Sequence, residues 1–140
     1  VKHRLQFVGE HKGVKFYNDS KATNIIATQT ALRSFTNQSV VLIAGGLDRG
    51  NGFDELVSDL TSVSGIVLYG ETKEKLQEAA KVAGIPVIEV VNTLEEATTK
   101  AYEISKEDDI VLLSPACASW DQFKNFEIRG DEFIRIVENL

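Results

Sequence analysis

Short, nearly continuous apolar runs alternate along this chain with longer runs in which apolar residues recur every three to four positions. The short runs are rich in Val, Ile and Leu, as is typical of strands buried on both faces of a sheet; they lie at 39–46, 65–70, 85–90 and 109–115. The longer runs have the spacing of amphipathic helices; they lie at 53–62, 72–84 and 93–107. This alternation of strand and helix predicts a parallel sheet.

Several of the predicted helices carry residues that start or stop a helix. Thr72 and Thr93 stand at expected N-cap positions, and Glu96 follows Thr93 at the spacing of a capping box. Gly84 stands where the second predicted helix should end. These end signals agree with the hydrophobic pattern.

At the amino end, residues 5–18 form two β-rich runs around a polar tip at residues 10–13, which is the pattern of a β-hairpin. Right-handed crossovers between parallel strands place helices on both faces of a sheet. Since the chain has no internal repeat or linker, residues 1–140 are expected to form a single domain. The predicted fold is α/β: a doubly wound, mostly parallel, Rossmann-like sheet with an edge β-hairpin and helices on both faces.

Charge and composition exclude several classes of partner. A net charge of -6 and a pI near 4.9 argue against nucleic acid and acidic membranes, because both require a basic face. The sequence has no apolar run of about 20 residues and no basic-then-apolar leader, so we expect a soluble protein that is not exported. The single cysteine, Cys117, cannot form an internal disulfide and fits a reducing compartment.

Three polar segments follow predicted strands. They are residues 18–24 after the hairpin, 45–53 after the first buried strand and 114–126 after the last. Ligands of doubly wound folds bind outside the carboxyl ends of the parallel strands. We therefore expect the chemistry of this chain to lie in these segments.

The segment Asn18–Asn24 combines helix-capping residues with a cation. Asn, Asp, Ser and Thr before a helix usually satisfy its free amide groups, and capping is one interpretation of this segment. Capping gives no reason for Lys21, because a cation at the positive end of a helix is mildly unfavourable unless an anion also binds there. The alternative interpretation is a site for a carboxylate or a phosphate.

The glycine-rich turn at residues 44–50 does not match a nucleotide-binding loop. G-x-G-x-x-G is absent there, and G-x-x-x-x-G-K-[ST] is absent from the whole chain. The turn presents Asp48 and Arg49. Arg49 forms either a solvated salt bridge or a bidentate contact with a carboxylate, and the sequence leaves both interpretations open.

The last polar segment has small residues at 116–119, which leave room for a ligand close to the backbone. Ser119 is its candidate ligand contact, whereas Cys117 is interpreted as a buried filler because neither histidine has a context that marks it as a partner. Asp121 is expected to open a helix whose aromatic residues lie mostly in the core. No spacing of His and Cys in the sequence matches a metal site.

Four stretches stand out for their length or their chemistry: HRLQFV, NDSKATN, GGLDRG and SPACASWDQFKNFEIRG. In this order and at these separations they resemble the C-terminal domain of the Mur ligases that add D-glutamate in bacterial peptidoglycan synthesis. The similarity runs from Lys2 to the end of the chain. The alternatives are a sister Mur ligase or folylpolyglutamate synthase, which share the architecture, a non-catalytic binding module, or loops that serve only as caps and turns.

The resemblance implies two sets of contacts for the two carboxylates of D-glutamate. Thr23 and Arg49 would hold the α-carboxylate. Ser119, with backbone amides near Trp120 and Phe126, would hold the side-chain carboxylate. This sequence departs from many relatives in having Arg49 in place of a lysine and the bulky Trp120 beside Ser119.

The resemblance also implies contacts with ATP. Arg4 would reach the phosphates, Asp19 would accept from the ribose hydroxyls, and the catalytic Lys21 would lie near the transferred phosphate or the glutamate. In the family, ATP with Mg2+ activates the carboxylate of UDP-N-acetylmuramoyl-L-alanine as an acyl phosphate, which the amine of D-glutamate attacks.

The parts of this reaction that the chain lacks are implied to lie elsewhere. In the family, an N-terminal UDP-binding domain and a central ATPase domain supply the P-loop and the metal ligands, and neither domain is present in this chain. The isolated domain is therefore expected to be inactive, and the enzyme to be a cytoplasmic monomer that closes around its substrates.

Overall fold

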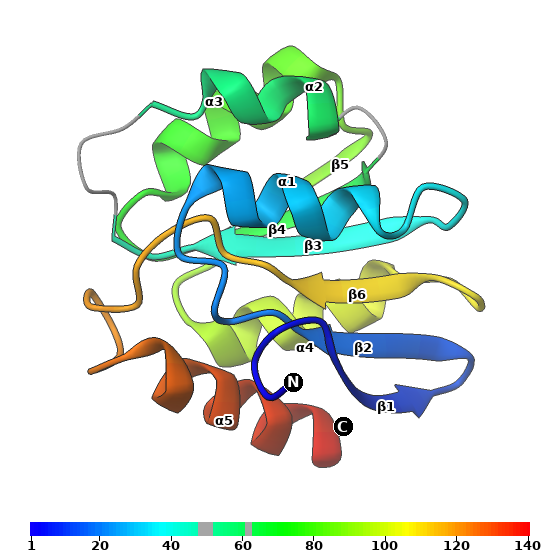
Figure 1. Ribbon diagram of the computed structural model, residues 1–140. Coiled ribbons are helices and arrows are strands. Elements are labelled where there is room, and N and C mark those ends of the chain that lie inside the picture. Colours follow the sequence, from blue (N-terminus) through cyan, green and yellow to red (C-terminus); the bar gives the residue numbers. More distant parts are fainter. Residues whose placement is uncertain (48–51, 61–62) are drawn as a thin grey trace.

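The computed structural model describes residues 1–47, 52–60 and 63–140. It contains a six-stranded sheet with the strand order β1-β2-β6-β3-β4-β5 (Figure 1). β1 and β2 pair antiparallel, and the other neighbouring pairs are parallel. The strands are β1 (Gln6–His11), β2 (Val14–Asn18), β3 (Val40–Gly45), β4 (Val63–Tyr69), β5 (Val87–Val90) and β6 (Ile110–Leu113). The predicted mostly parallel sheet with an edge hairpin is confirmed.

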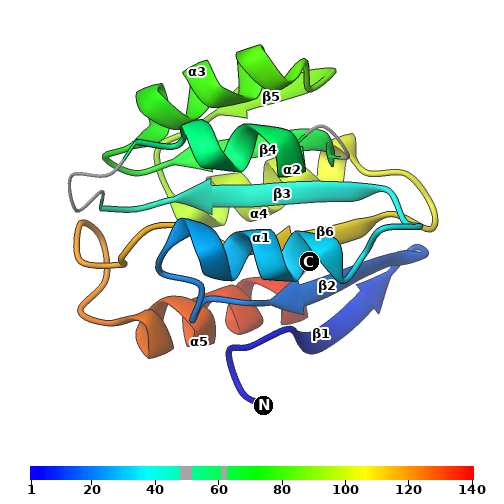
Figure 2. The same cartoon turned by 45° about the horizontal axis from the view of Figure 1, so that its top comes forward.

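Helices cover both faces of the sheet, as the sequence predicts (Figures 1 and 2). One hydrophobic cluster joins the sheet to α1, α2 and α3, and a second joins it to α4 and α5. Side chains alternate between these two clusters along β3, where Leu42 faces the first and Ile43 the second. The helices are α1 (Ile25–Arg33), α2 (Val57–Leu60), α3 (Lys73–Ala83), α4 (Leu94–Ile104) and α5 (Phe126–Glu138), with a 3-10 turn at Asp54–Leu56.

Two expectations about these elements are wrong. The run at 85–90 does not form a strand buried on both faces. β5 is the edge strand of the described sheet and pairs there with β4, so that Val87 and Val90 are more than a third exposed. Asp121 does not open a helix. α5 begins after Asn125, whose side chain accepts a hydrogen bond from the Ile128 amide at 2.8 Å.

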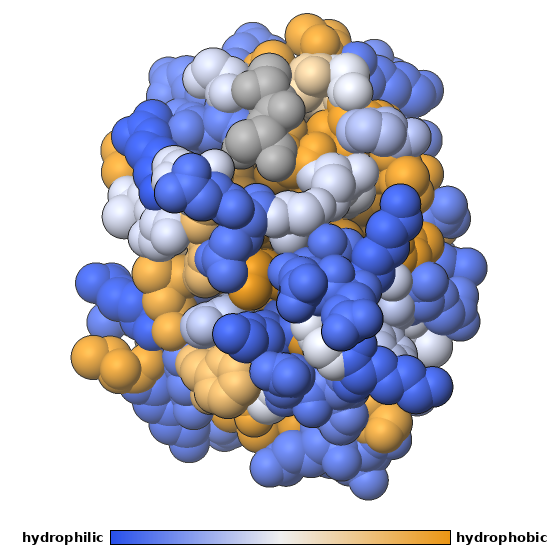
Figure 3. All heavy atoms as spheres, turned by 90° about the vertical axis from the view of Figure 1, so that its right-hand side faces the viewer, coloured by the Kyte–Doolittle hydropathy of each residue, from blue (hydrophilic) through white to orange (hydrophobic). Residues whose placement is uncertain are grey.

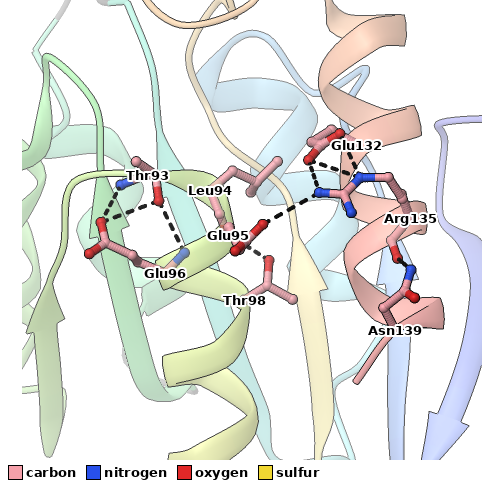
Figure 4. Close-up of polar contacts among 8 residues, drawn as sticks. All are labelled: Thr93, Leu94, Glu95, Glu96, Thr98, Glu132, Arg135 and Asn139. Carbon is pink, nitrogen blue, oxygen red and sulfur yellow. Dashed lines mark hydrogen bonds and ion pairs between the residues drawn. The ribbon is translucent and has the colours of Figure 1, made fainter.

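Two of the predicted helix-end signals are confirmed, and the third, at Thr72, is only partly so. Thr93 and Glu96 form the expected capping box, in which each side chain accepts from the other residue's amide at 3.1 Å (Figure 4). Gly84 ends α3 in the left-handed conformation. Thr72 is at the N-cap position of α3, but its hydroxyl donates to the Gly46 carbonyl at 3.0 Å and does not cap the helix.

The amino ends of the parallel strands form a largely hydrophilic face (Figure 3). This face includes a hollow lined by Glu107, Asp108 and Asp109 as well as Lys15. Since acidic side chains repel anions, this edge is poorly suited to a carboxylate or phosphate ligand.

Candidate functional site

The strand order brings the three polar segments to the same edge of the sheet. β6 lies between β2 and β3, so that Leu113 pairs with Asn18 on one side and Ile43 on the other. Backbone hydrogen bonds continue this pairing beyond the strands: the Asp19 amide donates to Leu113 at 2.8 Å, and the Gly45 amide to Pro115 at 3.1 Å. The segments that follow β2, β3 and β6 therefore begin side by side, joined by backbone hydrogen bonds.

The glycines at the end of β3 and directly after it are required by close packing. The φ angle of Gly45 is +142°, and a Cβ atom there would lie 1.9 Å from the Tyr69 carbonyl oxygen. At Gly46, with a φ of +137°, a Cβ atom would lie 2.2 Å from the Ala118 oxygen. Both positions exclude a side chain. The turn is thereby held between the end of β4 and the segment that carries Ser119.

A buried arginine joins the first polar segment to the last. Arg129 of α5 is fully buried, and its Nε and Nη2 atoms donate to the Ser20 hydroxyl at 3.0 Å and the Ser20 carbonyl at 2.7 Å. Its Nη1 atom donates to the Cys117 carbonyl at 3.0 Å. Burial lowers the pKa of Arg129 below its ordinary value. The guanidinium group fixes the spacing between the two segments.

Three of the predicted site residues line one cavity. It has a volume of about 160 Å3 and lies between the amino-terminal segment, the segment that follows β2, and α1. Arg4 and Lys21 are exposed, whereas Asp19 is only 4% exposed. The lining consists of Arg4, Leu5, Asp19, Lys21, Ala22, Ala27, Thr30 and Ala31. Two cations and one buried carboxylate therefore share this cavity.

Asp19 already has two protein donors. Its Oδ1 atom accepts from the Leu5 amide at 3.1 Å, and its Oδ2 atom accepts from the Ser114 hydroxyl at 2.7 Å. Burial raises the pKa of Asp19, and these hydrogen bonds and the charge of Arg4 oppose that shift. A carboxylate has about four acceptor sites, so Asp19 retains capacity for a ligand hydroxyl.

The structure separates capping from the other roles of the first segment. The N-cap of α1 is Asn24, whose side chain accepts from the Ala27 amide at 2.9 Å. Capping therefore does not use Lys21, which is exposed, or Thr23, which is half-buried. The two residues lie between a buried segment and the start of a helix, where backbone dipoles favour an anion.

The residues predicted to hold the side-chain carboxylate lie in the last segment. Ser119 is 2% exposed, and Trp120 is 57% exposed. Phe126 is half-buried, and its carbonyl accepts the Ser20 hydroxyl at 2.7 Å. These three residues do not line the cavity around Asp19. Arg49 lies outside the described residues.

Cys117 is 2% exposed, which agrees with a small buried filler. Its sulfur lies 3.3 Å from the Thr72 hydroxyl. Within the described ranges, no three His, Cys, Asp or Glu side chains are grouped so that they could hold a metal ion. No helix in the same ranges has the length and apolar character needed to cross a membrane.

Sequence reasoning missed two buried residues at this edge, Arg129 and His3. Arg129 occurs in an amphipathic helix, where an arginine ordinarily points to solvent. His3 is 4% exposed and precedes the predicted Arg4. One sequence signal could have indicated a role for Arg129. It lies one turn after the start of α5, the helix that follows the last polar segment.

The fold resembles solved ligase structures. UDP-N-acetylmuramate-alanine ligase from Thermotoga maritima matches with a TM-score of 0.66 at 15% identity, over 99% of this chain and 30% of that one. A MurF ligase from the same organism, in complex with ADP, matches with a TM-score of 0.63 at 18% identity, over 99% and 31% of the two chains. At these identities the likeness establishes the fold.

Curated relatives are much closer in sequence. The chain is 61% identical over its full length to UDP-N-acetylmuramoylalanine–D-glutamate ligase from Bacillus cereus and 59% identical to that from Enterococcus faecalis. It spans 31% of the length of each. The family model described as "Mur ligase, glutamate ligase domain" matches residues 3–117. With that match over most of its length, the chain belongs to the Mur ligase family, as its glutamate ligase domain.

Proposed function

We propose that this chain is the amino-acid-binding, C-terminal domain of a cytoplasmic, monomeric ligase that adds D-glutamate to UDP-N-acetylmuramoyl-L-alanine with hydrolysis of ATP. The observation that carries the proposal is the identity of about 60% to D-glutamate ligases along all 140 residues. The solved structures of an alanine ligase and of a 2,6-diaminopimelate ligase each match at 15% identity. A sister ligase is therefore the weaker candidate.

The cavity around Asp19 supports a nucleotide contact. Arg4 and Lys21 are cations suited to phosphate oxygens, and Asp19 can accept from a ribose hydroxyl. The cavity of about 160 Å3 is smaller than the roughly 300–1,000 Å3 usual for a small-molecule site. We propose that it forms one wall of the ATP site and that UDP-binding and ATPase domains outside this chain supply the rest.

D-glutamate would bind beside this wall. Thr23 follows directly after the cavity residues, and Arg129 holds their segment against the one that carries Ser119. We propose Thr23 and Arg49 as donors to the α-carboxylate. Ser119, with the backbone near Trp120 and Phe126, is proposed for the side-chain carboxylate; since Ser119 is buried, the segment would have to open slightly to bind it.

ATP, when bound with Mg2+, supplies the phosphoryl group that activates the carboxylate of the nucleotide substrate. The described residues of this chain offer no group of metal ligands, and we propose that the metal is held outside it. The contribution of this chain is to place cations where negative charge develops. Lys21, exposed at the cavity mouth, would stabilise charge on the transferred phosphate.

The amino-acid specificity tests the proposed function. In the intact protein, D-glutamate is expected to support ATP-dependent amide formation on UDP-N-acetylmuramoyl-L-alanine, whereas L-glutamate, L-alanine and diamino acids are not. Product formation is measured with each amino acid at equal concentration. A preference for any of the other amino acids would reject the proposal in favour of a sister ligase.

Asp19→Asn is expected to separate nucleotide binding from stability. The amide oxygen can still accept from the Leu5 amide, and the amide nitrogen can donate to the Ser114 hydroxyl. Because the folded-state pKa of Asp19 is raised, its charge disfavours folding as the pH rises above the ordinary value of 3.8. The variant should therefore keep or raise Tm at neutral pH, while KM for ATP rises on the order of tenfold. A fall in Tm with unchanged KM would assign Asp19 a structural role only.

A further inference from the structure

We propose that His3 is a positioning residue that fixes Arg4, Asp19 and Lys21 around the nucleotide cavity. The inference rests on the proposed function, because it assigns His3 a part in ATP binding. His3 is neither in the cavity lining nor exposed to a ligand. Its effect must therefore pass through the residues that it holds.

The imidazole ring of His3 is seated against a glycine of α5. A Cβ atom on Gly130 would lie 2.1 Å from the His3 Nδ1 atom and 2.6 Å from its Cε1 atom. The ring also meets the edge of Phe126, with a centroid distance of 6.1 Å. The seat thus depends on the absence of a side chain at position 130, and it anchors the amino-terminal segment to α5.

The hydrogen bonds of Asn18 define the protonation of His3. The Asn18 Oδ1 atom accepts from the Ser20 amide at 3.1 Å, which directs the amide nitrogen toward the His3 Nδ1 atom at 2.9 Å. That nitrogen also donates to the Gln6 side chain at 3.1 Å. Because an amide nitrogen only donates, Nδ1 must accept and the ring proton belongs on Nε2.

The charged groups that face His3 agree with a neutral ring. Burial lowers the pKa of His3, and the charge of Lys2 acts in the same direction. The carboxylates of Asp131 and Glu127 on α5 oppose the shift. The Nε2 atom lies 3.6 Å from the Asp131 carboxylate. The neutral ring can therefore keep its Nδ1 acceptor for Asn18.

The backbone on either side of this ring reaches all three cavity residues. The His3 carbonyl accepts from the Lys21 amide at 3.0 Å. Arg4 is the next residue in the chain, and the amide of Leu5 donates to Asp19 at 3.1 Å. The φ angle of His3 is +67°, a conformation uncommon outside glycine. The hydrogen bond between Asn18 and the His3 Nδ1 atom is assigned the main part in holding this turn. The packing of the ring on Gly130 and the bond from the His3 amide to the Gln6 side chain at 3.0 Å support it.

Two replacements of His3 in the intact ligase separate the effect of the hydrogen-bond acceptor from the effect of the ring. His3→Asn retains an acceptor near the position of Nδ1 but loses ring volume, and His3→Phe retains a ring without an acceptor. We expect His3→Phe to raise KM for ATP on the order of tenfold and to leave KM for D-glutamate within about twofold. His3→Asn should restore most of the ATP affinity. The matched control is His11→Phe, because His11 lies on the hairpin against Phe16 and Tyr102.

Arg4→Ala, measured in parallel, separates this inference from the proposed function. If Arg4→Ala weakens ATP binding and His3→Phe does not, the positioning role is wrong while the proposed function stands. If both KM values rise together in both His3 variants, following a loss of Tm, His3 serves only for stability and the inference is overturned. If Arg4→Ala leaves KM for ATP unchanged, the cavity is not part of the ATP site, and the positioning role of His3 is rejected as well.

Magnetic resonance of the 140-residue chain tests the hydrogen bonds directly. The nitrogen chemical shifts of the His3 ring should show an unprotonated Nδ1 and a protonated Nε2. The amide hydrogen of Lys21 should exchange with solvent faster in His3→Phe than in the parent chain. A proton on Nδ1, or unchanged exchange of the Lys21 amide, would contradict the proposed arrangement.

Discussion

Replacing Lys21 by alanine in the intact protein is expected to lower kcat by on the order of a hundred- to a thousandfold. The side chain lines the cavity, is exposed and does not cap α1. Its loss would therefore remove the cation proposed to lie near the transferred phosphate and would take little from the fold. Tm should therefore stay nearly constant. Steady-state kinetics and a thermal melt of the same preparation give both quantities.

The control for Lys21→Ala is Lys81→Ala, which removes an exposed lysine from the last turn of α3. It should change neither kcat nor Tm appreciably. Thr23→Ala belongs to the same comparison and is expected to raise KM for D-glutamate with a smaller effect on KM for ATP. A large drop in Tm with normal turnover in either Lys21→Ala or Thr23→Ala would mean that the segment serves only for capping.

Replacing Arg129 by methionine is expected to destabilise the fold by about 2–6 kcal/mol, because each of two buried carbonyls left without a donor costs about 1–3 kcal/mol. The change keeps an apolar stem but leaves the Ser20 and Cys117 carbonyls without their buried donor. The two segments of the candidate site would then lose their fixed spacing. Denaturant unfolding of parent and variant measures the loss.

The matched control for Arg129 lies two turns farther along the same helix. Arg135 is exposed and pairs with Glu132 and Glu95 at the surface (Figure 4). Since exposed ion pairs contribute little, Arg135→Met should leave Tm almost unchanged. If both variants lost the same amount of stability, the buried hydrogen bonds of Arg129 would contribute no more than the exposed ion pairs of Arg135.

Hydrophobic pattern alone predicts the centre of this fold. β3, β4 and β6 lie within their predicted runs or within two residues of them, because buried strands need near-continuous apolar sequence. The pattern does not distinguish the edge strand β5, since its exposure depends on the absence of a further neighbour. The start of α5 was missed because both Asp121 and Asn125 are suitable caps, and only tertiary contacts decide between them. The Asp121 carboxylate accepts the Glu71 amide at 3.0 Å instead.

The predicted order of strands was also sufficient to locate the polar edge of the sheet, because each of the three polar segments directly follows a strand. The roles of Arg4, Asp19 and Lys21 came from the resemblance, and their common cavity is a finding of the structure. The local sequence of His3 does not show its burial, and that of Arg129 gives only its place near the start of a helix, because both side chains are held by segments distant in the chain. The expectation for Arg49 concerns a residue outside the described ranges and stays a prediction.

The place of β6 between β2 and β3 has a consequence for synthesis of the chain. Of the described strands, Ile110–Leu113 is the last to be made, yet it supplies the only bridge between the hairpin and the rest of the described sheet. A nascent chain therefore cannot close its sheet until this strand has left the ribosome. Such non-local pairing slows folding and leaves the edges of β2 and β3 open to wrong partners in the meantime.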